Sequence, residues 1–320
     1  MIPGGVAHEP RPGAAIMSRV THTQLMLRPS DYPVLIEHAA RYSDLDPSRR
    51  IGRDALVRWF EDARIAVERD VFGAALVGRM RLLLASVRVD VLAPLQVAAR
   101  SAVGARIEAG QYRIGIGVSH IGTSSFAYTY GVYAGDECVA TGESVSVHAT
   151  TGGPAPLPEP VREALKTLRM DAPEPTRLQR GPARVVREAY PFRLDVRTRF
   201  GDLDPNRHVN NVALAGWYLD GLAELHLDVL GYPTGGPLDG LSPSSLRVDY
   251  LDEVRYPGIY QLRVGVLDLD DASVRYACGL FDGPQCIGLA EAVGAHHLPE
   301  EAGDPGDLAA RLEPFRMRSV

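Results

Sequence analysis

A short segment of the sequence, from Gly201 to Asn211, carries three side chains that could do chemistry together: Asp204, Asn206 and His208. A carboxylate or an imidazole can act as a general base, and a carboxylate can also attack a carbonyl carbon to form a transient anhydride. An amide side chain can hold a water molecule or a carbonyl oxygen. The segment therefore indicates a site that activates water, or a carboxylate, for attack on a carbonyl group.

Simpler interpretations of the same residues stay open. An Asp just before a helix commonly caps the helix or closes a turn, and this interpretation suffices for Asp202. A single His is more often structural than catalytic, so His208 gains weight only because Asp204 and Asn206 accompany it. Two carboxylates and one His in a loop are also compatible metal ligands, which makes Asp202, Asp204 and His208 an alternative metal site.

Two periodicities predict the elements that must position this segment. From Phe192 to Phe200 apolar and charged side chains alternate, which is the pattern of a half-buried strand. Over residues 211–230 apolar side chains, Trp217 among them, recur every three and four positions, as in a helix packed on a sheet. The free N–H groups at the start of that helix, near Asn211, could polarise a carbonyl.

The same arrangement occurs twice in the chain. Residues 32–73 align with residues 190–231, and the alignment pairs the two Asp-Leu-Asp-Pro runs, which begin at Asp44 and Asp202, and the two tryptophans. Later stretches repeat as well, and we expect strands over Arg113–Val118, Ser124–Tyr133, Glu137–His148, Gly258–Leu267 and Ser273–Phe281. The sequence predicts a flexible segment over 1–30, a first domain over 31–170, a linker over 171–188 and a second domain over 189–320.

The composition bounds the class of protein. The chain has 320 residues, enough for two domains, and 45% hydrophobic and 23% charged residues indicate a folded globular protein. The net charge of -6 argues against a general nucleic-acid binder, and no apolar run is long enough to span a bilayer. Cys138, Cys278 and Cys286 have neither a disulfide framework nor a zinc-binding spacing, which favours a reducing, cytoplasmic location.

The repeated unit resembles a hotdog domain, a curved antiparallel sheet wrapped around one long helix. The expected fold class is therefore α+β, with tandem hotdog domains over about Asp31–Met170 and Ala189–Met317. In the second copy the run Asp-Leu-Asp-Pro-Asn-Arg-His-Val-Asn-Asn-Val, starting at Asp202, is similar to the active-site segment of plant-type acyl-acyl-carrier-protein thioesterases. The Asp-x-Asp-Pro core and Ile121–Phe126 also resemble the wider group of 4-hydroxybenzoyl-CoA thioesterase-like proteins.

This resemblance implies a thioester hydrolase without metal or other cofactor, and it implies roles for individual residues. The two domains would pack sheet to sheet as a pseudo-dimer, with their helices on opposite sides and substrate channels along the domain interface. The number of residues between His208 and the fourth expected catalytic residue, Glu253, is larger than is usual in the family. The expected catalytic residues are Asp204, Asn206, His208 and Glu253, and the candidate substrate-binding residues are Asn210, Asn211, Trp217, Asp46 and Arg50.

Comparison of the copies indicates that only the second is catalytic. The first copy keeps the carboxylate as Asp46, but Ser48, Arg50, Arg53 and Pro94 stand where the second has Asn206, His208, Asn211 and Glu253. We therefore expect Asp46→Ala to keep most activity and Asp204→Ala to abolish it. The arginines at the start of the first helix could bind a phosphate or carboxylate, or could be solvated surface.

The function expected from the sequence is hydrolysis of an acyl thioester of acyl carrier protein or coenzyme A to free acid and thiol. Asp204 would act as the base, with Asn206 and His208 assisting. A non-hydrolytic protein that binds acyl thioesters, and a hotdog hydratase or dehydratase, remain alternatives. The expected partner is the thioester substrate, with no nucleic acid and no membrane span, and the chain would be a monomer with an internal pseudo-dimer or a homodimer.

Overall fold

The structure, a computed structural model, describes residues 27–47, 49–73, 80–96, 111–178, 180–230, 242–270, 273–295 and 305–318. Most of the segment predicted to be flexible, and Ser48, lie outside these residues. The first half of the chain forms a short strand, a long helix and an antiparallel run: β1 (Val34–His38), α1 (Arg53–Val71), β2 (Arg81–Val91), β3 (Tyr112–Ile121), β4 (Ser125–Ala134), β5 (Glu137–Thr150), the two-residue β6 (Gly153–Pro154) and α3 (Glu159–Thr167).

The second half repeats this order of elements after a segment with two short 3-10 turns, Pro182–Val185 and Arg187–Ala189. The predicted strands and the Trp-bearing helix are confirmed within a few residues at their ends. The elements are β7 (Phe192–Arg197), α4 (Asn211–Leu230), β8 (Ser245–Tyr250), β9 (Ile259–Leu269), β10 (Ser273–Asp282), β11 (Gln285–Ala295) and α5 (Pro305–Leu312).

One large antiparallel sheet joins the two halves. Its strand order is β1-β3-β4-β5-β2-β8-β11-β10-β9-β7, so the second half mirrors the first about the β2–β8 pair. These two strands pair antiparallel, with Val87 opposite Val248 and Arg88 opposite Arg247. The α+β fold with tandem hotdog units is therefore confirmed, and the two units share one hydrogen-bonded ladder.

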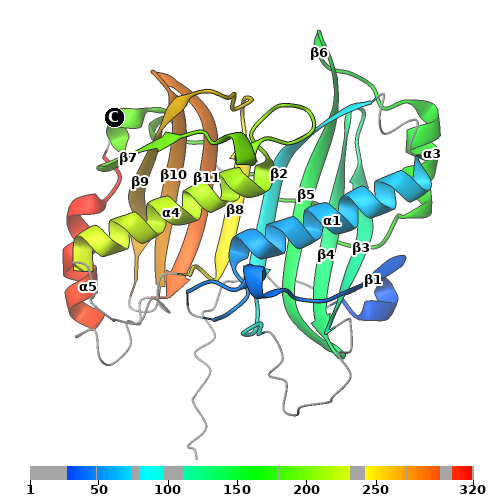
Figure 1. Cartoon of the computed structure of the whole chain (residues 1–320), viewed down its shortest axis with the longest axis horizontal. Coiled ribbons are helices and arrows are strands. Elements are labelled where there is room, and N and C mark those ends of the chain that lie inside the picture. Colours follow the sequence, from blue (N-terminus) through cyan, green and yellow to red (C-terminus); the bar gives the residue numbers. More distant parts are fainter. Residues whose placement is uncertain are drawn as a thin grey trace, which may run out of the picture.

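The position of the helices differs from the expectation. Both α1 and α4 cross the same face of the continuous sheet, and they contact each other near its centre (Figure 1). The expected placement on opposite sides is wrong, because the units join edge to edge through β2 and β8 rather than stacking face to face. This join brings the start of α4 close to α1, so the loop before α4 lies against the first unit.

Apolar side chains hold each helix on its sheet. Trp59 and Phe60 of α1 are each 1% exposed, and the Phe60 ring stacks on Tyr130 of β4 with centroids 4.5 Å apart. Full burial of side chains of this size contributes about 1.5–3 kcal/mol each. Gly142 of β5 permits the close approach, because a Cβ at this position would collide with the Phe60 ring.

The outer edges of the sheet are two short strands with charged side chains. β1 has exposed Leu35 and Glu37, and β7 presents Arg193, Asp195 and Arg197 to solvent, alternating with partly buried apolar residues. None of the described helices is long and apolar enough to cross a membrane.

Candidate active site

The loop before α4 is organised by the carboxylate of Asp204. Its Oδ1 accepts the backbone N–H groups of Asn206, at 2.8 Å, and His208, at 3.1 Å, and its Oδ2 accepts the side-chain amide of Asn206 at 3.1 Å. The backbone closes the same turn, since the Asp204 N–H donates to the His208 carbonyl at 2.9 Å. Arg207 has a φ of 67°, the left-handed conformation that lets the chain reverse here. Three donors thus engage this carboxylate.

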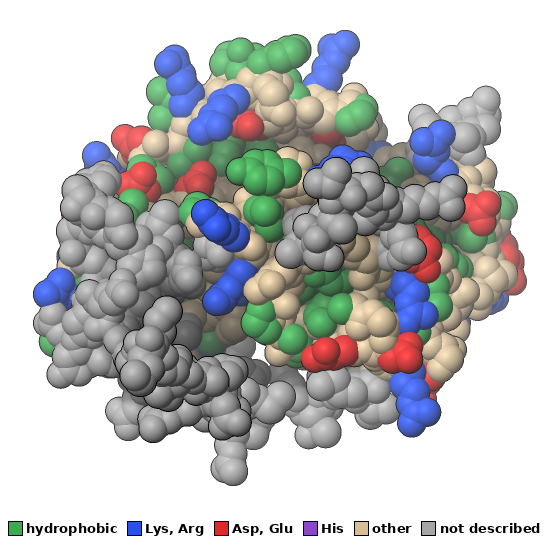
Figure 2. All heavy atoms as spheres, turned by 60° about the horizontal axis from the view of Figure 1, so that its bottom comes forward, with side chains coloured by type: hydrophobic (Ala, Val, Ile, Leu, Met, Phe, Trp, Pro, Cys, Tyr) green, Lys and Arg blue, Asp and Glu red, His purple; other side chains and the backbone are tan. Residues whose placement is uncertain are grey.

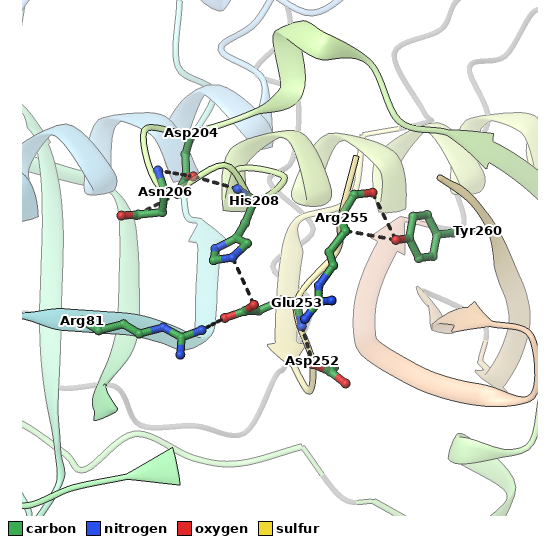
Figure 3. Close-up of polar contacts among 8 residues, drawn as sticks. All are labelled: Arg81, Asp204, Asn206, His208, Asp252, Glu253, Arg255 and Tyr260. Atoms are coloured by element: carbon green, nitrogen blue, oxygen red, sulfur yellow. Dashed lines mark hydrogen bonds and ion pairs between the residues drawn. The ribbon is translucent and has the colours of Figure 1, made fainter. Parts of the chain in front are cut away.

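His208 points away from Asp204, toward the segment that follows β8. Its Nε2 lies 3.1 Å from Oε2 of Glu253, and the other carboxylate oxygen of Glu253 contacts the guanidinium of Arg81 (Figure 3). Glu253 therefore bridges an imidazole from the second unit and an arginine of β2 in the first. The imidazole and the carboxylate are partly exposed, at 27% and 21% of their side chains, so substrate and water can reach them.

Neighbouring contacts fix the segment that carries Glu253. The Val209 N–H donates to the Val254 carbonyl at 3.0 Å, which ties this segment to the His208 loop. Tyr260 accepts the Arg255 N–H at 3.0 Å and donates to the Arg255 carbonyl at 3.1 Å, and Gln285 donates to Asp252 at 3.0 Å. The position of Glu253 beside His208 is therefore set by backbone contacts as well as by its side-chain contacts with His208 and Arg81.

The other residues expected at the site surround the start of α4. Asn210 accepts the Val212 N–H at 2.6 Å, so it caps the helix, and its amide donates to Glu61 of α1 at 3.0 Å. The N–H of Asn211 donates to no described residue and stands at the positive end of the helix dipole. Its carbonyl accepts the hydroxyl of Tyr250 at 3.2 Å. Trp217 is 6% exposed within the core, two turns further along α4.

The equivalent loop of the first copy has the same turn and different chemistry. Asp46 Oδ1 accepts the Arg50 N–H at 3.1 Å, and Arg49 has a φ of 62°, as in the second copy. The other carboxylate oxygen of Asp46, Oδ2, accepts the hydroxyl of Ser242 at 2.8 Å. Arg53 is buried and donates to the carbonyls of Pro243 and Ile51, so it is not solvated surface. Burial lowers the pKa of Arg53 to about 10.

Sequence reasoning did not identify Arg81, which lies 172 positions from Glu253 in the chain. No motif pointed to it, and only the pairing of β2 with β8 brings it to the site. Asp202 has the structural role expected of it, because it accepts the Arg199 N–H at 2.9 Å. Among the described residues, no group of three His, Cys, Asp or Glu side chains is arranged to hold a metal ion.

A family model supports the resemblance that the loop suggests. Residues 187–263 match the acyl-ACP thioesterase C-terminal domain, a range that includes Asp204, Asn206, His208 and Glu253. The chain is similar to the acyl-ACP thioesterases. This match supports thioester hydrolysis as the activity of the protein. No curated protein matches the sequence.

Solved thioesterase structures share the fold over most of the chain. A proposed oleoyl thioesterase from Lactobacillus plantarum matches with a TM-score of 0.64 and 17% identity, over 84% of this chain and 96% of the other. A 12:0-ACP thioesterase from Umbellularia californica matches with a TM-score of 0.61 and 14% identity, over 82% and 97%. An acyl-ACP thioesterase from Bacteroides thetaiotaomicron matches with 0.59 and 13%, over 82% and 97%. At these identities the likeness establishes the fold alone.

Proposed function

We propose that the protein hydrolyses an acyl thioester of acyl carrier protein or coenzyme A, with His208 as the general base. The observation that carries this assignment is the 3.1 Å contact between His208 Nε2 and Glu253. A carboxylate at one ring nitrogen holds the imidazole in the tautomer whose other nitrogen, here Nδ1, keeps a lone pair. Asp204 is the weaker candidate for the base, because three donors already engage its carboxylate.

The proposed reaction proceeds through a tetrahedral intermediate. Nδ1 of His208 takes a proton from water as the water oxygen attacks the thioester carbonyl, and Glu253 stabilises the imidazolium that forms. The Asn211 N–H, at the start of α4, donates to the oxyanion. The carbon–sulfur bond then breaks, and the leaving sulfur takes the proton from His208, which gives a free acid and a thiol. Asp204 keeps the loop in shape and accepts the Asn206 amide beside it.

Either carrier of the acyl group is compatible with the part of the surface that Figure 2 describes. On the face shown in Figure 2, outside the grey atoms, Lys and Arg side chains are interspersed with acidic and apolar ones and do not gather into one basic patch. A strongly basic surface would favour an acidic carrier protein. The choice between acyl carrier protein and coenzyme A is therefore left to direct comparison of the two kinds of substrate.

The test is thiol release from matched acyl-CoA and acyl-carrier-protein substrates of short, long and aromatic acyl groups. We expect turnover by the wild type, and a loss of at least about 100-fold in kcat for Glu253→Gln, which keeps the shape and removes the charge beside His208. The control is Glu37→Gln, which makes the same change at an exposed position of the edge strand β1 and should retain turnover. Saturable binding without thiol release from any substrate would instead support a non-hydrolytic binding protein, and equal rates for the two variants would remove Glu253 from the mechanism.

A further inference from the structure

The first unit contains a cluster of polar side chains beneath α1, where a hotdog core is otherwise apolar. Arg64 and Glu68 follow Phe60 at intervals of four, so they lie on the sheet-facing side of the helix, and they are 8% and 1% exposed. Tyr130 and Ser144, on the adjacent strands β4 and β5, are 1% and 2% exposed and hydrogen-bond to each other at 2.7 Å. Burial of such groups costs free energy unless they are well paired.

The cluster is incompletely paired. The guanidinium of Arg64 lies 3.6 Å from Glu68 and 3.7 Å from Glu61, beyond ordinary hydrogen-bond distance. Within the described residues, no hydrogen bond reaches Oε1 of Glu68, the hydroxyl of Tyr128 or the hydroxyl of Ser146, all of them buried. Since buried polar atoms are nearly always satisfied in folded proteins, this cluster has capacity for one more polar group.

A cavity of about 10 Å³ lies beside the cluster, with Glu61, Arg64, Tyr130 and Ser144 in its wall; Glu68, Tyr128 and Ser146 are not among its lining residues. This volume takes about one water-sized group and not a run of methylenes. The wall contains one positive and one negative side chain, Arg64 and Glu61, so a carboxylate would gain no net electrostatic attraction here. A hydroxyl or keto oxygen is neutral and can accept from Arg64, and a hydroxyl can also donate to a glutamate.

The cavity is linked to the candidate active site by two elements. Glu61, in its wall, accepts the amide of Asn210, which caps α4 two residues after His208. On β2, Leu84 in the cavity wall lies three residues from Arg81, which contacts Glu253. The cavity wall and the candidate active site are therefore supported by the same two elements, α1 and β2.

The second copy lacks these side chains at equivalent positions. By the alignment of the two copies, Leu222 corresponds to Arg64, and Cys278 and Ala292 correspond to Tyr130 and Ser144. Among its described residues, His226 and Tyr276 form a polar pair in this region, 2.7 Å apart. The polar cluster is thus a property of the first copy and not a requirement of the fold.

We propose that the acyl group of the substrate carries a neutral oxygen function, a hydroxyl or a keto oxygen, which Arg64, Tyr130 and Ser144 bind beneath α1. The inference rests on the proposed thioesterase function and adds the class of acyl group. The copy without catalytic groups would then select the substrate that the other copy hydrolyses. A site built to hydrogen-bond a substrate oxygen discriminates strongly against the analogue that lacks it.

The experiment compares kcat/KM for pairs of acyl-CoA substrates of equal chain length, unsubstituted or with a hydroxyl or keto oxygen at successive carbons. We expect the wild type to prefer one oxygenated substrate by about 10-fold or more. Tyr130→Phe, which keeps the ring on Phe60, and Ser144→Ala should each bring this ratio toward one. Tyr276→Phe is the matched control, because it removes a buried hydroxyl from the second copy and should keep the ratio.

The outcomes separate the inference from the function on which it rests. Thiol release with no preference for oxygenated acyl groups, or a preference that Tyr130→Phe and Ser144→Ala leave intact, would overturn the inference alone. Absence of thiol release would overturn the function. In that case calorimetric binding of non-hydrolysable thioether analogues of the same pairs gives the ratio, and equal affinities in the wild type would overturn the inference as well. Thermal unfolding of each variant verifies that it is folded.

Discussion

The loops before α1 and α4 have the same backbone and different side-chain chemistry. In both, an aspartate accepts the N–H of the residue four positions later, and the residue before that one has a positive φ. In both, a backbone contact ties the loop to the segment after the central strand, from Ile51 to Leu95 and from Val209 to Val254. Only the second loop adds an imidazole beside a carboxylate. The aspartate is therefore first a structural requirement of the turn, and the histidine is what distinguishes the copy to which we assign the chemistry.

The largest predicted effect on kcat is a difference between substitutions at His208 and at Arg50, which occupy the same position in the two loops. Removal of the base in His208→Ala should lower kcat by about 1000-fold or more, because water is then no longer deprotonated as it attacks. Arg50→Ala, at the matching position of the first loop, should change kcat less than about three-fold. The measurement is steady-state thiol release. Comparable losses in both variants would mean that both loops are catalytic.

The next effect separates the two aspartates. Asp204→Ala should lower kcat by about 100-fold or more, because the loop that carries Asn206 and His208 loses its three contacts to the carboxylate. Asp46→Ala removes the same brace from the first loop and should retain most of the activity while lowering the melting temperature. Kinetics and thermal unfolding of both variants test this, and equal kinetic losses would contradict a single catalytic copy.

A buried position in the helices gives a stability prediction. His226 is 6% exposed and bonds to the Tyr276 hydroxyl, and burial lowers its pKa from 6.5 to about 4. The unfolded chain therefore binds a proton at His226 more readily than the folded chain. The stability of the fold is unaffected by this group above pH 6.5, and the free energy of unfolding decreases as the pH falls toward 4. The loss is about 3 kcal/mol. Chemical denaturation at pH 7 and pH 4 should show it for the wild type and not for His226→Gln, and identical pH dependences would refute it.

At the corresponding position of the first copy, burial shifts the pKa in the opposite direction. Glu68 aligns with His226, and burial raises the pKa of its carboxyl, whereas burial lowers that of the imidazole. In both cases the low-polarity interior disfavours the charged form. Arg64 partly opposes the shift at Glu68 by stabilising the carboxylate. The two cores therefore accommodate a buried titratable side chain in different ways. The second copy pairs His226 with the hydroxyl of Tyr276, and the first places Glu68 beside Arg64.

The smallest predicted effect concerns the contribution of the first copy to the site. Arg81→Gln removes the cation beside Glu253 and should lower kcat by about 10-fold, since the carboxylate is then held to His208 less firmly. The plot of kcat against pH should also shift, because the imidazole senses the charge balance around Glu253. Arg113→Gln, which removes a partly exposed arginine paired with the exposed Asp136, is the control. An unchanged pH profile in Arg81→Gln would leave Arg81 with a structural role only.

Local patterns explain which parts of the fold could be predicted. The helix stripe of Leu214, Trp217 and Leu225 and the alternation in β7 are properties of neighbouring residues, and both elements form as expected. The edge-to-edge join of β2 and β8 was not predicted, because it depends on which of several strand edges meet. The helices were consequently expected on the wrong faces.

The candidate site was predictable only as far as its residues lie in one segment. Asp204, Asn206 and His208 are close in sequence, and their turn follows from that spacing. The partner Glu253 was expected only from resemblance to a family, and Arg81 was not expected at all. Arg64 and Glu68 were missed for another reason, since a helix stripe defined by apolar residues leaves out charged side chains that are nevertheless buried.

The outer edges of the sheet have a consequence for how many copies can be joined. A sheet whose central ladder connects two units could in principle continue to a third at either end, since edge strands leave backbone donors and acceptors unpaired. Here β1 has only five residues and β7 only six, and β7 alternates Arg193, Asp195 and Arg197 along its exposed side. Short, charged borders resist addition of another strand. The sheet therefore favours two units, because both edge strands disfavour the addition of a third unit or of another molecule.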